Sequence, residues 1–308
     1  MRTSLRLSGT LAAIALLSGL LPAAAVAPAS STVAAAYPLL ADSPLGPAQL
    51  RDLPAGVILQ AAGLTLTQKD LEAEVAKSPA AMQGQLRQSG IFLVEQMASR
   101  SLLLREAKAW GAKHGASGQA EGAVIQAYLK RQAASVVLSD AETRRFYDGN
   151  KTLFAGLPFD QVKQEIRSYL LGQKQQAAVE LHVNTLVQRA EPALDRAWAQ
   201  KQYRAAIDNP VDKARLSGKP TLVDFGASGC VPCDMMAPIL ESLRREYEGK
   251  ANVIFVHVGE QQVLASRYGI RAIPVQVFFD RSGQEVSRHV GFFAEDDIKA
   301  KLREAGVK

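Results

Sequence analysis

Residues 222–240 read LVDFGASGCVPCDMMAPIL, and they carry the strongest structural signal in the second half of the chain. It begins with apolar and β-branched residues, which are typical of a buried strand, and ends with the apolar spacing of an amphipathic helix. Between the two lie Cys230 and Cys233, the only cysteines among the 308 residues. All cysteine chemistry of this protein therefore belongs to one Cys-x-x-C motif at the junction of a strand and a helix.

The two cysteines differ in their position on the predicted helix. Cys230 lies at its start, where unpaired N–H groups and the helix dipole favour a thiolate, so we predict that it is the attacking sulfur. Cys233 follows one turn later and can displace a mixed disulfide to close a Cys230–Cys233 bridge, so we predict that it is the resolving sulfur. Asp224 interrupts the preceding strand. Desolvation raises the pKa of a carboxyl, which suits a proton acceptor for Cys233. The alternative for Asp224 is a satisfied polar residue of the core.

Two other uses of a cysteine pair fit the sequence less well. Zinc requires about four ligands, and the histidines show no metal-ligand spacing relative to the cysteines. The histidines are His114, His182, His257 and His289. A structural disulfide across so short a loop excludes few unfolded conformations and stabilises little. We therefore predict a redox site that has no metal and no cofactor other than the redox-active disulfide itself.

The residues that follow the motif predict a mixed sheet flanked by helices. The expected strands are 221–227, 251–258, 275–279 and 285–290, and the expected helices after the motif are 263–268 and 295–305. This order combines a parallel half with a hairpin. We assign residues 193–308 to this α/β domain.

Residues 205–308 resemble the thioredoxin family. The matching features are a strand with a central Asp, the Cys-x-x-C motif, Pro238 inside the following helix, and an Ile-Pro pair whose Pro274 lies 41 residues after Cys233. The passage YGIRAIPVQVFFDRSGQE contains that pair. The resemblance implies that the Ile273–Pro274 bond is cis and packs beside the two sulfurs, with Pro274 part of the catalytic centre.

Predicted substrate contacts lie on both sides of the motif. Pro274 has no N–H, which leaves an edge where a substrate backbone can pair with Ile273. Val231 and Pro232 lie between the cysteines and complete the expected substrate-binding surface.

Three residues depart from the thioredoxin pattern. Gly226 and Gly229 stand where thioredoxins usually have tryptophan, so the aromatic surface beside the sulfurs is missing. Asp234 stands where a basic residue is more common, and its charge opposes the neighbouring thiolate. These departures leave the substrate preference open.

The first half, residues 57–192, has the periodicity of amphipathic helices and predicts an all-α domain. Its longest predicted helix covers residues 159–189. Thr67 has the position of a helix N-cap, and Ser139 has Glu142 at the capping-box position three residues later.

Segments of this half resemble the N-terminal chaperone region of secreted parvulin-type prolyl isomerases, the family of SurA. The segments include FLVEQMASRSLLLREAKAWG from Phe92 and PFDQVKQEIRSYLLGQKQQ from Pro158. In that family an isomerase module is inserted before the second segment, but here only Thr152 to Leu157 separate Lys151 from Pro158. The resemblance thus implies a clamp-like surface for clients without isomerase activity. The alternative is a helical spacer or dimerisation unit.

Residues 1–27 have the pattern of a secretory signal peptide. Arg2 and Arg6 precede an uncharged apolar run that ends in small residues. The alternative is an uncleaved membrane anchor. Residues 28–56 are rich in Ala, Pro and Ser without periodicity, and we predict a flexible lead there. A periplasmic or secreted location follows, with or without an N-terminal anchor.

The distribution of charge along the chain argues against nucleic acid as a partner. The net charge of +6 is spread along the chain without a dense basic segment, so we exclude nucleic acid as a partner. The fold class is α+β, with a helical domain followed by an α/β domain. We predict an exported thiol–disulfide oxidoreductase that reduces disulfides of client proteins and is kept reduced by a membrane electron carrier. The alternative is a holdase chaperone with an accessory redox module.

Overall fold

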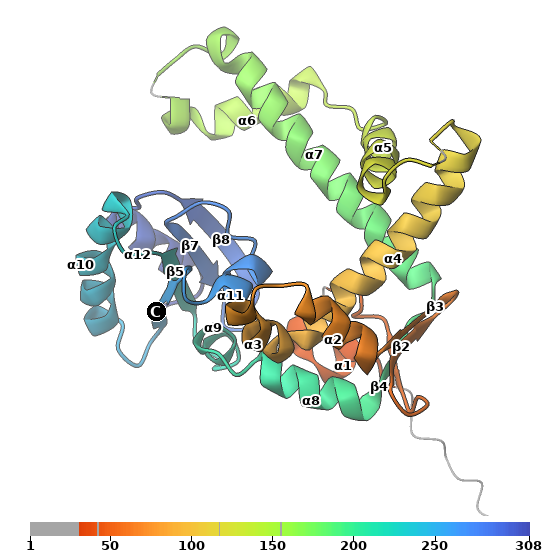
Figure 1. Ribbon diagram of the computed structural model, residues 1–308. Coiled ribbons are helices and arrows are strands. Elements are labelled where there is room, and N and C mark those ends of the chain that lie inside the picture. The colour runs from red at the N-terminus through yellow and green to blue at the C-terminus, as the bar shows by residue number, and fades with distance from the viewer. Residues whose placement is uncertain (1–30, 42, 117, 155) are drawn as a thin grey trace, which may run out of the picture. The chain divides into compact units, whose positions relative to one another are not determined.

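The computed structural model describes residues 31–41, 43–116, 118–154 and 156–308 (Figure 1). The expected signal peptide, residues 1–27, lies outside these ranges. Within them no helix is both long enough and apolar enough to cross a membrane.

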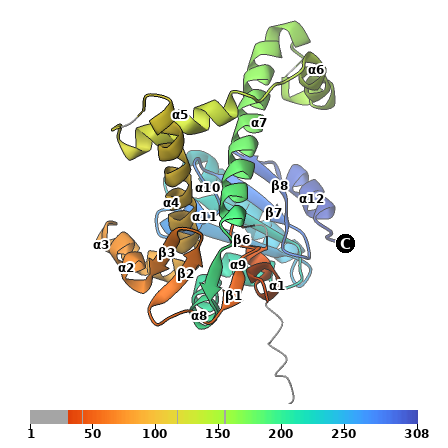
Figure 2. The same cartoon turned by 90° about the vertical axis from the view of Figure 1, so that its right-hand side faces the viewer.

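The first part of the described chain is mainly helical. Its helices are α1 (Val33–Ala36), α2 (Gln68–Ala76), α3 (Ala80–Gln88), α4 (Gly90–Lys113), α5 (Glu121–Ala133), α6 (Asp140–Gly149), α7 (Phe159–Arg189) and α8 (Arg196–Ala206), and its 3-10 turns are η1 (Pro38–Leu40) and η2 (Lys151–Phe154). Its strands are β1 (Gln49–Arg51), β2 (Val57–Ala61), β3 (Leu64–Thr67) and β4 (Ala193–Asp195). Helix α5 packs beside α4 and α7, as both cartoon views show (Figure 1, Figure 2).

Local sequence signals set the helix starts. The Thr67 side chain accepts a hydrogen bond from the backbone N–H of Asp70, and the Asp70 carboxylate accepts one from the backbone N–H of Thr67. Ser139 and Glu142 form the same reciprocal capping box at the start of α6. Both predicted N-caps are therefore confirmed, because each side chain satisfies backbone donors that a helix start leaves free. Helix α7 also covers the range that the sequence predicts.

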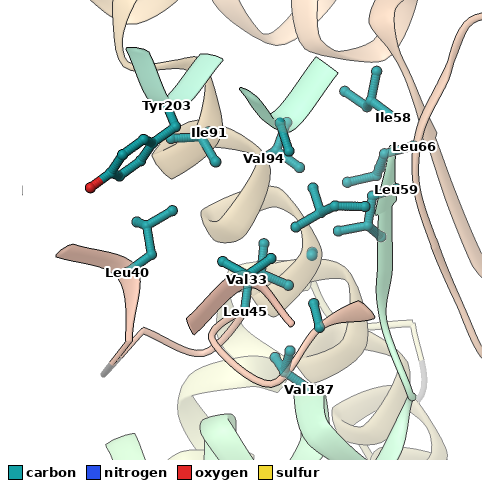
Figure 3. Close-up of a cluster of buried hydrophobic side chains, with 14 of the residues drawn as sticks. Val33, Leu40, Leu45, Ile58, Leu59, Leu66, Ile91, Val94, Val187 and Tyr203 are labelled. Atoms are coloured by element: carbon teal, nitrogen blue, oxygen red, sulfur yellow. The ribbon is translucent and has the colours of Figure 1, made fainter. Parts of the chain in front are cut away.

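The hydrophobic core of the first part joins the small sheet to α1, α4 and α8. The sheet has the order β1-β4-β2-β3, in which β1 and β4 are parallel and the other pairs antiparallel. Figure 3 shows the side chains of this core pointing toward one another. The labelled residues are Val33, Leu40, Leu45, Ile58, Leu59, Leu66, Ile91, Val94, Val187 and Tyr203.

Two features of the first part differ from the sequence prediction. The predicted flexible lead, residues 28–56, contains α1, η1 and β1, and Val33 and Leu45 are buried in the core. The predicted all-α domain, residues 57–192, is mainly helical but also contains β2 and β3, which form a four-stranded sheet with β1 before it and β4 after it. Strands β1 and β4 have three residues each, which are too few to show a period of two, whereas Leu64–Thr67 of β3 does alternate between apolar and polar residues. Strands β1 and β4 also pair across a long stretch of chain, as Leu50 and Leu194 do, whereas β2 and β3 form a local hairpin in which Ala61 stands opposite Leu64.

The second part has the predicted mixed sheet. Its strands are β5 (Thr221–Gly226), β6 (Asn252–His257), β7 (Val275–Phe279) and β8 (Glu285–Val290), and its helices are α9 (Pro210–Arg215), α10 (Val231–Glu246), α11 (Gln262–Arg267) and α12 (Glu295–Glu304). The sheet order is β6-β5-β7-β8; β5 and β6 are parallel, whereas β7 is antiparallel to both β5 and β8. The parallel half and the hairpin are both confirmed. The fold class is thus α+β, as predicted.

Helices cover both faces of this second sheet. Leu222 and Phe278 pack on one face with residues of α10 and α12. Val223 and Val277 pack on the other face with residues of α9 and α11. Because side chains alternate along a strand, Asp224 of β5 lies on the α10 face, and the same helix carries the cysteines.

Candidate active site

The two cysteines lie at the N-terminus of α10, directly after β5. They form a disulfide, with their Cα atoms 5.2 Å apart. Cys230 is the N-cap residue of α10 and is partly exposed, whereas Cys233 is buried, with 5% of its surface accessible. An incoming thiol or disulfide can therefore reach Cys230 more readily than Cys233.

The start of α10 favours negative charge at Cys230. No side chain caps this helix, so its first backbone N–H groups are available to the Cys230 sulfur. These groups and the helix dipole stabilise a thiolate once the disulfide is reduced. Gly229, with a φ of 76°, makes the turn from strand to helix in a conformation that favours glycine. Asp234 lies in the first turn and its negative charge acts against the thiolate.

The predicted substrate-binding residues lie at the N-terminal ends of α10 and β7. The Ile273–Pro274 peptide bond is cis, as the resemblance implied. Pro274 is buried, and its carbonyl accepts a hydrogen bond from the N–H of Gly291 at 2.8 Å. Ile273 and Pro232 are partly exposed, and Val231 is 71% exposed. A substrate can therefore contact the side chains of Ile273, Pro232 and Val231 while the protein stays folded.

Asp224 is fully buried on β5. Its Oδ1 atom accepts a hydrogen bond from Gln276 Nε2 at 2.6 Å, and its Oδ2 atom has no partner. Burial raises the pKa of Asp224 to about 6, although the Gln276 hydrogen bond and the charge of Arg244 act in the opposite direction. The carboxyl is therefore only half satisfied, and it can change its protonation state near neutral pH.

The C-terminal part of the chain matches known sequences. The family described as Thioredoxin matches residues 199–304. The thioredoxin of Chlorobaculum thiosulfatiphilum is 38% identical over 106 residues, which are 34% of this chain and 97% of that protein. Thioredoxin 1 of a Nostoc species is 45% identical over 86 residues, which are 28% of this chain and 79% of that protein. A thioredoxin of Staphylococcus aureus is 42% identical over 81 residues, which are 26% and 77% of the two chains. The chain belongs to the thioredoxin family.

Membership in the thioredoxin family makes this chain a protein-disulfide oxidoreductase, and the Cys230–Cys233 pair is the disulfide that the structure contains. The matched region starts at residue 199, within α8. The relatives thus correspond to the part of the chain that carries the cysteines, and we call the matched residues, 199–304, the thioredoxin domain.

Gly226 of the thioredoxin domain lies between Phe255 and Cys233. A β-carbon at Gly226 would lie 2.9 Å from Cε2 of Phe255 and 3.5 Å from Sγ of Cys233. The absence of a side chain at this position therefore lets the Phe255 ring approach the buried sulfur.

A hollow of about 240 Å³ opens beside the buried cysteine. Its lining includes Cys233, Asp234, Arg244 and Phe255. It joins an aromatic ring, a cation and the buried sulfur of Cys233 in one space, which is large enough to hold water next to the sulfur.

Sequence reasoning missed two contacts of this site. Gln276 interrupts the apolar run VQVFF, and this polar residue could have been noticed as a partner for Asp224. The sequence gives no role to His257, but its Nε2 atom accepts a hydrogen bond from the backbone N–H of Ser228 at 3.2 Å. It thus holds the loop that leads to Cys230, and only the fold brings these residues together.

Each of the other histidines contacts an aromatic side chain. His114 stacks on Trp110, His182 contacts the hydroxyl of Tyr128, and His289 stacks on Phe293. Among the residues that the structure describes, no three or more potential ligands gather in a way that could hold a metal ion.

Proposed function

We propose that this protein is an exported reductase of protein disulfides that works through Cys230 and Cys233. The observation that carries the proposal is the asymmetry of the pair. A partly exposed sulfur lies at an uncapped helix start, and it is joined to a buried sulfur on the side of the helix that covers Asp224. Attack by one sulfur and release by the other require this arrangement.

The reaction begins with the reduced dithiol. The Cys230 thiolate attacks one sulfur of a client disulfide, and a mixed disulfide forms between Cys230 and that sulfur. The second client sulfur leaves with the electron pair and takes up a proton. The client segment lies against Ile273, Val231 and Pro232, where the backbone of Ile273 is free to pair with it.

The second step releases the client. Cys233 gives its proton to Asp224, directly or through water in the adjoining hollow, and its sulfur attacks Sγ of Cys230. The bond between Cys230 and the client breaks, and the client sulfur leaves as a thiolate that takes up a proton. The Cys230–Cys233 disulfide forms again, and two electrons have passed from the protein to the client.

Variants of the two cysteines test this order of attack. Cys230→Ser should abolish the reduction of insulin disulfides. Cys233→Ala should accumulate clients as mixed disulfides on Cys230, visible as dithiothreitol-sensitive bands after denaturing electrophoresis. The double variant Cys230→Ser, Cys233→Ala is the control and should trap nothing. Reduction of insulin by Cys230→Ser would refute the assignment of the attacking sulfur.

The direction and the location of the reaction are further parts of the proposal. The pattern of residues 1–27 supports export, and in an oxidising compartment the dithiol needs a steady source of electrons. A membrane electron carrier of the thiol–disulfide type supplies them. Fractionation of a bacterium that expresses the full chain should place it outside the cytoplasm, and retention in the cytoplasm would contradict export. Equilibration in glutathione buffers measures the reduction potential. A value near that of oxidising periplasmic enzymes would reverse the direction.

The helical part supplies the second candidate function, that of a holdase or client-docking unit. Several large apolar side chains in and near its helices are exposed. They are Val137, Leu157, Tyr169 and Leu181. Exposed apolar groups of this kind are suited to binding unfolded segments. The resemblance to the SurA family supports the same role.

The full chain without its cysteines tests this second candidate. Cys230→Ser, Cys233→Ser should still slow the aggregation of an unfolded client, and adding Leu181→Lys and Tyr169→Lys should weaken that effect. Val286→Lys, at an exposed apolar position of β8 in the thioredoxin domain, is the matched control. If the cysteine-free chain does not slow aggregation, the helical part is a spacer or a dimerisation unit.

A further inference from the structure

Gln276 is the immediate neighbour of Asp224 in the centre of the sheet. Strands β5 and β7 are the two middle strands, and these residues stand directly opposite each other in their antiparallel register. Cross-strand partners point to the same face, here the face that α10 covers. Gly226 follows on that face, and its missing β-carbon would lie 3.5 Å from Sγ of Cys233. The pair therefore lies on the same face of the sheet as the glycine that faces the resolving sulfur, one position further along that face.

The two side chains of this pair include buried polar atoms that form no hydrogen bond. Both side chains are fully buried, and the hydrogen bond from Gln276 Nε2 to Asp224 Oδ1 is 2.6 Å long. Asp224 Oδ2 and Gln276 Oε1 have no partner. Buried polar atoms without partners cost free energy and are uncommon in folded proteins. A side chain such as leucine or methionine would fill the same position without this cost.

We propose that Gln276 is a positioning residue for proton transfer. Its amide binds Oδ1 of Asp224 and leaves Oδ2 as the oxygen that accepts the proton of Cys233. The proposal rests on the proposed function, because it assigns a task within the release step.

The chemistry of the two side chains fixes the direction of this hydrogen bond. An ionised carboxylate can only accept, so the –NH₂ end of the Gln276 amide faces Asp224. The donor stays in place when Oδ2 takes up a proton, because Oδ1 then remains a carbonyl-like acceptor. The bond is stronger to the charged form, and it therefore eases the return of the proton when the dithiol is regenerated.

Two charged residues of α10 and one histidine of β8 lie around the pair. Helix α10 contributes Arg244, whose positive charge lowers the pKa of Asp224. It also contributes Asp234, which lines the hollow beside Cys233 together with Arg244. On β6 the residue opposite Asp224 is Phe255, which has no charge. On β8 the residue opposite Gln276 is His289. His289 is therefore the residue whose replacement serves as the control in any pH profile.

Removal of the amide should change the pH dependence of the reaction. Gln276→Met keeps the length and the burial of the side chain but cannot donate to Asp224. The carboxylate then loses its hydrogen bond, and the inflection that Asp224 gives to the rate of client release should move upward by about one pH unit. If Gln276 only fills space, Gln276→Met lowers stability and leaves the inflection where it is.

The decisive experiment is a set of pH–rate profiles for single-turnover insulin reduction by the full chain. Asp224→Asn should remove the inflection, and Gln276→Met in that background should cause no further shift. His289→Gln is the control and should keep the profile of the unaltered protein. An unshifted inflection in Gln276→Met, or an equal shift with and without Asp224, would overturn the proposal.

A second measurement needs neither turnover nor a variant. In the oxidised full chain labelled with ¹³C and ¹⁵N, the side-chain amide signals of Gln276 should titrate with the same midpoint as the carboxyl carbon of Asp224. Amide signals that stay constant through that titration would also overturn the proposal. Because the oxidised chain carries out no reduction here, a failure of the proposed function would appear as absent turnover and not in this titration.

Discussion

Gly226 of β5 and the ring of Phe255 on β6 share one space beside the buried sulfur. A β-carbon at Gly226 would lie 2.9 Å from the ring and 3.4 Å from Cβ of Cys233. Contacts under about 3 Å between carbon atoms are repulsive because the attraction is best near 3.5–4.0 Å. The packing of Phe255 beside Cys233 therefore requires glycine at position 226.

Gly226→Ala should destabilise the protein by about 1 kcal/mol, because the added methyl group overpacks this contact. Urea unfolding measures the effect. Phe255→Ala opens the space, so Gly226→Ala should cost much less in that background. Gly84→Ala is the matched control, since no atom lies within 4 Å of its β-carbon position in α3. It should stabilise the helix by about 0.5–1 kcal/mol. Equal effects at both glycines would contradict the packing argument.

Asp224 should make stability fall as the pH rises. The pKa of its carboxyl is about 6 in the folded protein against an ordinary 3.8, so the folded state holds the proton more tightly than the unfolded state. Between about pH 4 and pH 6 the folded protein therefore loses stability, on the order of 3 kcal/mol in total.

Asp224→Asn removes this dependence. The variant should have nearly the stability of the unaltered protein at pH 4 and exceed it at pH 8, as measured by urea unfolding at each pH. The other carboxyls titrate alike in the two proteins, so their contribution cancels in the difference between the two free energies of unfolding. A constant difference across this range would show that Asp224 has an ordinary pKa.

Arg267→Met should destabilise the protein by about 3 kcal/mol, because it leaves a buried carboxylate without its nearest cation. Asp212 is fully buried, and Nη2 of Arg267 lies 2.9 Å from its Oδ2 atom. The Arg267 guanidinium also lies 3.8 Å from the ring centre of Phe92. Arg281→Met, on the exposed turn before β8, should change stability by no more than about 0.5 kcal/mol. Similar thermal midpoints for both variants would count against the buried pair.

Ser139→Ala should cost about 1 kcal/mol, because the capping box at the start of α6 is lost. The pKa of Glu142 is about 2, held down first by Lys174 and then by its hydrogen bonds from Ser139. It should rise in the variant, which an NMR titration of the carboxyl can follow. Ser135→Ala is the control, since its hydroxyl donates to the carbonyl of Gln132 outside a capping box. An unchanged Glu142 pKa would contradict the capping role.

The elements of the thioredoxin domain were predicted well because their signals are local. The runs 275–279 and 285–290 match β7 and β8 to the residue, and the turn between them specifies the hairpin. The Cys-x-x-C motif and the Ile-Pro pair could likewise be found without a structure. By contrast, the pairing of β1 with β4 and the folded segment before residue 57 were not predicted, because β1 finds its partner β4 across more than a hundred residues of chain. The hairpin of β2 and β3 was missed although its signal is local, since Leu64–Thr67 alternates between apolar and polar residues.

Sequence alone determined which chemistry this chain carries, since two cysteines in one motif allow a single redox site, and periodicity and capping signals act between near neighbours. Tertiary structure decided what surrounds that site. Phe255, His257 and Gln276 reach it through strand pairing and loop contacts, and a pairing register is set by the collective burial of side chains and not by any local pattern. For this reason the partner of Asp224 became visible only once β5 and β7 lay side by side.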